Sequence, residues 1–147
     1  MKLDLGCGSN PHPGFVGVDI CPPAEVIADL RQPWPWPDSS IAYVLAVDII
    51  EHLPDRINTL NELWRVLEPG GIAEIEVPTI DGECAFADPT HVSFWTRKTF
   101  DYFLQGQEYF DRYRQSYGIQ AVFQVVEEYV RTMRDGPKLL IKLRAVK

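Results

Sequence analysis

The sequence predicts an α/β protein built on a mostly parallel sheet, and three observations support this fold class. Short apolar runs separated by turn residues recur along the chain, which indicates strands. One long amphipathic pattern lies between two of these runs, as a crossover helix does in a parallel sheet. The last two runs are joined by a short connection at 131–137 that is typical of a hairpin. The expected strands occupy residues 2–5, 15–20, 25–28, 41–47, 72–77, 121–130 and 138–146.

The first third of the chain has room for strands but little room for helix. Seven of the 12 prolines fall within residues 11–37. A proline in a helix interior removes a hydrogen bond and clashes with the preceding turn, so we expect loops between the first strands. The run 41–47 is almost wholly apolar, which indicates a strand buried on both faces.

One strong helix is predicted after the fourth strand. Its apolar residues are spaced three or four apart, with Asp55 as the N-cap and Pro69-Gly70-Gly71 as the end; they are Ile57, Leu60, Leu63, Trp64 and Leu67. Residues 79–95 form a long connection, and such loops tend to be functional. Thr96 is expected to cap a short helix that carries Phe100 and Phe103.

Composition limits the function classes. The chain has 147 residues, which favours a single domain spanning 1–147, and its 46% hydrophobic content is typical of a globular protein. A net charge of −7 argues against a nucleic-acid-binding surface. No run approaches the ~18 apolar residues of a membrane span, and Met1–Asp4 begins no signal peptide. The three scattered cysteines fit reduced thiols, so we expect a cytoplasmic protein.

Polar residues gather at the predicted strand ends. Gly6 and Gly8 follow the first strand, Asp19 ends the second, and Asp29 and Asp48 end the third and fourth. Ligands of open α/β sheets bind beyond the carboxyl ends of the strands, and an acidic residue there can hold a ribose. An ordinary glycine turn, with Asp19 capping the next turn, is the alternative at this point.

The order of these segments resembles the class I S-adenosylmethionine-dependent methyltransferases, in particular the small-molecule, type 11-like members. The resemblance implies a Rossmann-like seven-stranded sheet of order 3-2-1-4-5-7-6 with strand 7 antiparallel, here with reduced helices in the first third. The segments that match the family are Leu3–Gly8, Gly17–Ile20, Ala28–Leu30, Trp34–Ser40, Ile50–Leu53 and Arg65–Gly71.

The resemblance implies S-adenosylmethionine as cofactor and assigns its contacts. Asp4, Gly6, Cys7 and Gly8 would lie against the methionine part. Asp19 would hold the ribose hydroxyls. Ile20, Asp29 and Leu30 would contact the adenine, and Val47 and Asp48 would face the sulfonium. All four groups lie at or near strand ends.

Three residues are candidates for removing a proton from the methyl acceptor: His91, His52 and Asp88. His52 could instead be structural at a helix start, and His91 could belong to a self-bonded turn. His12 is expected to be merely exposed, and the spacing of the histidines predicts no metal site. Among the aromatics, Phe94 and Trp95 are expected at the pocket rim.

We therefore expect methyl transfer to a small-molecule acceptor. One alternative is a non-catalytic methyltransferase-like binding or regulatory module, because the N-terminal helices of the family and its acid at the position of Ala42 are missing. A nicotinamide-dependent oxidoreductase is the other, although Asn10-Pro11 replaces the third glycine. A second copy of the chain or another partner is expected to cover the open cofactor face.

Overall fold

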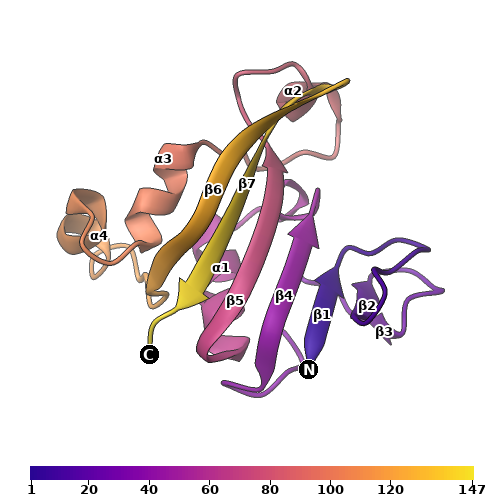
Figure 1. Cartoon of the computed structure of the whole chain (residues 1–147), viewed down its shortest axis with the longest axis horizontal. Helices are drawn as coiled ribbons and strands as arrows, with labels where there is room; N and C mark the ends of the chain where they lie inside the picture. Colours follow the sequence, from indigo (N-terminus) through magenta and orange to yellow (C-terminus); the bar gives the residue numbers. More distant parts are fainter.

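The computed structural model describes all residues from 1 to 147 and contains one seven-stranded sheet of order β3-β2-β1-β4-β5-β7-β6. Only β7 runs antiparallel to its neighbours (Figure 1). The predicted fold class and strand order are therefore confirmed. The strands are β1 (Lys2–Leu5), β2 (Val16–Asp19), β3 (Val26–Ile27), β4 (Ile41–Val47), β5 (Leu67–Pro78), β6 (Phe123–Met133) and β7 (Gly136–Ala145).

Loops alone connect the first four strands. The first helical segment of the chain is the 3₁₀ turn η1 (Ile50–His52), and the first α-helix is α1 (Arg56–Val66). The predicted loss of the early crossover helices is thus confirmed, and the prolines explain it. Figure 1 shows β2 and β3 as a small outer part of the sheet that is flanked by these loops.

Helix α1 begins where the sequence predicts but ends earlier. The Asp55 carboxylate accepts a hydrogen bond from the backbone N–H of Asn58 at 2.9 Å, which caps the first turn. The helix ends at Val66, before the predicted Pro69-Gly70-Gly71 stop, because Leu67 already has extended backbone and begins β5. The strand register, which pairs Leu67 with Ile41, therefore overrides the turn signal.

The two faces of the sheet differ in character. One face carries the core, against which α1 packs through Leu60 and Leu63. The other face carries charged side chains that pair across strands: Lys142 lies 3.5 Å from Glu74 and 3.1 Å from Glu127. The core face of β4, β5 and β7 consists of Val44, Ala46, Ala73, Ile75, Val77, Leu139, Ile141 and Leu143, all 2% exposed or less.

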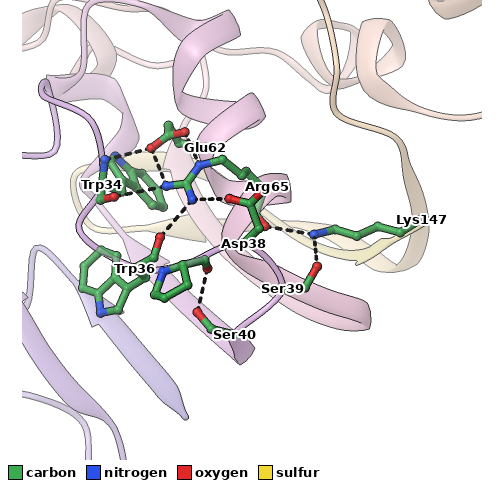
Figure 2. A network of polar contacts seen from close by, with 9 residues as sticks. Trp34, Trp36, Asp38, Ser39, Ser40, Glu62, Arg65 and Lys147 are labelled. Carbon is green, nitrogen blue, oxygen red and sulfur yellow. Dashed lines mark hydrogen bonds and ion pairs between the residues drawn. The ribbon is translucent and has the colours of Figure 1, made fainter.

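Arg65 makes several of the hydrogen bonds that hold the loop before β4 to α1 (Figure 2). The Arg65 guanidinium donates to the carbonyls of Trp34 and Trp36 at 3.1 and 2.9 Å and to the Asp38 carboxylate at 2.7 Å. It also makes two hydrogen bonds to Glu62, whose carboxylate in turn accepts from the Trp34 N–H. These contacts anchor the proline-rich loop where a crossover helix is missing.

The C-terminal hairpin is longer than predicted. Met133 pairs with Gly136, so only Arg134 and Asp135 form the turn, in place of the connection expected at 131–137. In Figure 1, β6 and β7 extend together beyond β5 towards α2 (Cys84–Ala87). The hairpin thereby brings residues near its turn to the loop that follows β5.

The region between β5 and β6 holds three short helical segments besides α2: α3 (Arg97–Phe100), η2 (Asp101–Phe103) and α4 (Glu108–Tyr113). Thr96 caps α3 as predicted, in a capping box with Thr99. Trp95 is fully buried, so its predicted place at the pocket rim is wrong: it belongs to the core with Phe100. None of the helices combines the length and the apolar composition needed to span a bilayer.

Candidate functional site

A cleft of about 390 Å³ opens at the carboxyl ends of β1, β2 and β3, and we call it the strand-end cleft. Its position follows from the parallel strands, whose ends meet at one edge of the sheet. Five of the predicted cofactor residues line it: Gly6, Asp19, Ile20, Asp29 and Leu30. The remaining lining residues are Ala28, Arg31, Ile49, His52, Leu53, Thr90 and Val92.

The turn after β1 is shaped by glycine. Gly6 has a φ of +68°, and a Cβ built on it would lie 2.7 Å from Cγ1 of Ile49. Only glycine fits this combination of backbone conformation and close approach. The backbone N–H groups of Gly6 and Cys7 donate to the Val18 carbonyl, so the turn is fastened to β2.

Asp19 lies at the rim of the strand-end cleft and holds two loops together. Its Oδ2 accepts from the Gly8 N–H at 2.9 Å and its Oδ1 accepts from the Cys21 N–H at 3.1 Å. Each carboxylate oxygen has a further lone pair for a ligand hydroxyl. Beside it, the Ile20 side chain is 54% exposed and offers an apolar surface to a flat ring.

Asp29 also lines the cleft and is paired with Arg31. The guanidinium donates to both carboxylate oxygens, from Nε at 2.8 Å and from Nη2 at 2.9 Å. These hydrogen bonds hold the pKa of Asp29 below its usual value. Arg31 is the only lysine or arginine that lines the cleft, and the Asp29 carboxylate matches its charge.

The other predicted cofactor residues lie outside the lining of the strand-end cleft: Asp4, Cys7, Gly8, Val47 and Asp48. Asp4 is buried, and its Oδ2 accepts from the backbone N–H of His12 at 2.8 Å and contacts His12 Nδ1 at 2.9 Å. His12 therefore ties the proline-rich turn to β1. This role of His12 was not predicted, because its contact with Asp4 is not visible in the local sequence of a proline-rich turn.

A second cavity of about 310 Å³ adjoins the cleft, and we call it the acidic cavity. His52 lines both spaces, so the cleft and the cavity meet at this side chain. Asp48 lies in the acidic cavity, has a φ of +50°, and pairs through Oδ2 with Lys138 at 2.6 Å. The lining residues are Asp48, Glu51, His52, Pro78, Cys84, Ala87, Asp88, His91, Asp135 and Lys138.

The three predicted proton acceptors meet in the acidic cavity. Thr90 donates its hydroxyl to Asp88 Oδ1 at 2.6 Å, and the same hydroxyl lies 3.0 Å from Nδ1 of His52. His91 lies beside them, with its ring centroid 4.8 Å from that of His52 in an edge-to-face arrangement. The Thr90 hydrogen bonds hold the pKa of Asp88 below its usual value, which makes it a weak base.

Glu51 was not predicted as a site residue, although it is the most unusual group of the cavity. Its side chain is 3% exposed, and neither carboxylate oxygen has a hydrogen-bond partner. Burial raises the pKa of Glu51 to about 7. Its own carbonyl accepts from the N–H groups of Val92 and Ser93, which brings η1 against the segment that follows His91.

Comparisons with known proteins relate part of the chain to methyltransferases. A family model described as a methyltransferase domain matches residues 3–75. The trans-aconitate 2-methyltransferase of Azoarcus sp. (strain BH72) is 32% identical over 52% of this chain and 38% of its own length. The chain thus spans about two fifths of that relative's length.

Solved structures share the fold at low sequence identity. A SAM-dependent methyltransferase from Methanosarcina mazei superposes with a TM-score of 0.63 at 15% identity, covering 99% of this chain and 92% of its own. A chain from the Haloferax volcanii complex that contains the Trm112 methyltransferase activator gives 0.66 at 17% identity, covering 99% and 82%. The match over residues 3–75 identifies this part of the chain as a methyltransferase domain, and the whole chain shares the seven-stranded fold of solved S-adenosylmethionine-dependent methyltransferases.

Proposed function

We propose that this chain binds S-adenosylmethionine in the strand-end cleft and transfers its methyl group to a small molecule in the acidic cavity. The observation that carries the proposal is the position of His52, which lines both spaces. A methyl group is transferred in line between two held reactants, so the two binding spaces have to meet. Here they meet at His52, which is one of the three predicted proton acceptors.

The residues of the cleft fit the cofactor's chemistry. An adenosyl group has a diol and a flat base, and Asp19 and the exposed Ile20 offer a carboxylate and an apolar surface to them. The cleft has neither a free lysine nor the N-terminus of an α-helix, which a pyrophosphate would need. This supports adenosylmethionine over a dinucleotide, and Asp19, Ile20, Asp29 and Leu30 would hold it.

The bound sulfonium supplies an already activated methyl group. The chain's own residues then have to orient the acceptor, exclude water and accept a proton where the acceptor is a hydroxyl or an amine. The Nδ1 of His52 is engaged by Thr90, so Nε2 is its free nitrogen for this task. His91 presents Nε2 in the same way, since its Nδ1 lies 3.0 Å from the Ala85 carbonyl. Asp88 orients His52 through Thr90.

Titration calorimetry with S-adenosylmethionine and S-adenosylhomocysteine tests the cofactor assignment. We expect Asp19→Ala to weaken binding about tenfold or more, the equivalent of a lost charged hydrogen-bond partner. Glu68→Ala, which changes an exposed carboxylate outside both cavities, is the matched control and should bind like the parent chain. Absence of binding at millimolar ligand by a folded protein would contradict the proposal.

A non-catalytic binding module is the second candidate, and the open loops in place of the early helices favour it. The two candidates differ in one measurement. An active enzyme transfers labelled methyl groups to the small-molecule fraction of a cell extract, and His91→Ala, at a residue that lines only the acidic cavity, reduces this transfer while cofactor binding persists. A binding module retains the cofactor without any transfer. The expectation that a partner or second copy covers the cofactor face stays a prediction.

A further inference from the structure

We propose that Glu51, His52 and His91 bind one divalent transition-metal ion of the zinc or iron(II) class in the acidic cavity. One potential ligand atom from each of the three residues lies within 4.8 Å of the other two. Two imidazoles and one carboxylate are a donor set that such ions prefer. Sequence spacing does not predict this site, because Glu51 and His52 are adjacent in η1 while His91 comes from the loop after β5.

Glu51 is the observation that points to a ligand. A carboxylate that is 3% exposed and has no hydrogen-bond partner on either oxygen is costly to bury. The nearest side-chain nitrogen, Nε2 of His91, is 3.9 Å from Oε1 and too far away for a hydrogen bond. Lys138 is engaged with Asp48 instead. A metal ion would supply the positive charge that the carboxylate lacks.

Both histidines are oriented to present a lone pair. The Ala85 carbonyl can only accept, so the hydrogen bond from His91 requires a proton on Nδ1 and leaves Nε2 free. The Thr90 hydroxyl donates its proton to Asp88, so it accepts from Nδ1 of His52, and Nε2 of that ring is free as well. Metal-binding histidines commonly donate their second nitrogen in this way, and this outer shell fixes the ring.

The spacing is close to that of a bound ion. Ligands of a tetrahedral ion at ~2.0–2.1 Å lie about 3.4 Å apart. The Glu51–His91 pair at 3.9 Å already approaches this value, and a pair at the full 4.8 Å would have to close by about 1.4 Å. A fourth position would face the acidic cavity. An acceptor oxygen or nitrogen bound there would lie next to the strand-end cleft. Because both Nε2 atoms are ligands in the metal-bound protein, lowering of the pKa of a bound acceptor hydroxyl by the ion would then replace proton acceptance by the histidines. This point rests on the proposed function, whereas metal binding itself does not.

The test uses tag-free protein that has been stripped with a chelator and then titrated with Zn²⁺ by calorimetry and with Co²⁺ by visible absorption. We expect one ion per chain and Co²⁺ bands that differ from those of the hydrated ion. Glu51→Gln, which nearly keeps the side-chain shape, and His91→Ala should each weaken binding about 100-fold or more. His12→Ala, which removes a histidine outside the cavity, should leave the affinity unchanged.

The outer shell provides a second, milder test. Thr90→Val removes the hydroxyl that orients His52 and should weaken Co²⁺ binding about tenfold, while Thr90→Ser should retain it. Circular dichroism and binding of S-adenosylhomocysteine report on folding and on the cleft independently of the metal. Absence of stoichiometric Zn²⁺ and Co²⁺ binding by the folded parent chain, or equal binding by Glu51→Gln, would overturn the proposal and leave the cofactor assignment intact.

Discussion

Gly6 combines a left-handed backbone with a close approach to Ile49, which lines the strand-end cleft. We expect Gly6→Ala to destabilise the fold by about 1–3 kcal/mol through backbone strain. It should also weaken S-adenosylhomocysteine binding, because the new methyl group displaces Ile49. Urea denaturation and titration calorimetry measure the two effects.

Gly106 is the matched control for this substitution. It has a φ of +83°, and nothing lies within 4 Å of an added Cβ. Gly106→Ala should therefore share the backbone strain without the loss of ligand affinity. Equal affinities in the two variants would show that the Gly6–Ile49 contact does not shape the cleft.

Tyr43 lies on the charged face of the sheet and donates a hydrogen bond to Glu74. Burial, aided by this carboxylate, raises its pKa from 10.0 to about 12. The folded state therefore favours the neutral phenol. Its contribution to stability should be fully present below pH 10 and should be lost as the pH rises through 12.

Phenolate absorbance and urea denaturation across the alkaline range check this expectation. Tyr43→Phe should remove the latest phase of the tyrosine titration and flatten the alkaline loss of stability. Tyr129→Phe, which changes an exposed tyrosine on β6, should leave both in place. A tyrosine titration that is identical in the parent chain and Tyr43→Phe would contradict the assignment.

Some site residues could be predicted from the sequence and others could not, for a physical reason. Asp19 and Asp29 follow strand ends, and parallel strands bring their ends to one edge of the sheet, so local patterns were enough to place them. The Asp4–His12 contact and the burial of Glu51 depend instead on how the loops pack in the folded chain. Glu51 is buried because Val92 and Ser93, about 40 residues later, bind its carbonyl. No local pattern contains that information.

Arg65 fixes the loop between β3 and β4 to α1, at a place in the fold where a crossover helix is missing. Arg65→Ala would leave the carbonyls of Trp34 and Trp36 and the Glu62 carboxylate without this donor. We expect a loss of about 2–4 kcal/mol in the free energy of unfolding, measured in urea. Arg65→Lys should recover only part of it, since an ammonium group cannot reproduce the planar fork of donors.

Arg144→Ala provides the control for this element. Arg144 is an exposed residue of β7, and its loss should change stability by no more than about 0.5 kcal/mol. Tryptophan fluorescence adds local information, because Trp34 belongs to the anchored loop and its side chain is buried. An Arg65→Ala variant as stable as the parent chain would show that apolar packing of Trp34 holds the loop without the arginine.

Element boundaries were harder to predict than element types. The capped start of α1 was visible in the sequence because Asp55 acts locally on the backbone of the next turn. Its end was not, because Leu67 leaves the helix to pair with Ile41 across the sheet. The hairpin turn was likewise predicted too long: Gly136 and Pro137 are turn formers, yet they pair in register with Met133 and Thr132 across β6 and β7. Long-range pairing outweighed local preference in both places.

At the scale of the whole molecule, the strand-end cleft is assembled from segments far apart in sequence. It is lined by Gly6, residues 19–20, residues 28–31, Ile49, His52, Leu53, Thr90 and Val92. A ligand that binds only the folded chain stabilises it by about 2.7 kcal/mol at 100 times its dissociation constant. For a domain of this size we expect S-adenosylhomocysteine to raise Tm by about 5–10 °C at that excess.

Hydrogen exchange locates this stabilisation within the fold. Because the ligand would bridge the ends of β1, β2 and β3 to η1, protection should increase in the turns after those strands and around Thr90. The turn of the β6–β7 hairpin, at Arg134 and Asp135, lines no part of the cleft and should exchange as in the free protein. The Tm shift and the added protection should both diminish in Asp19→Ala. Protection spread evenly over the hairpin and the strand ends would mean that the ligand acts on global stability from a different site.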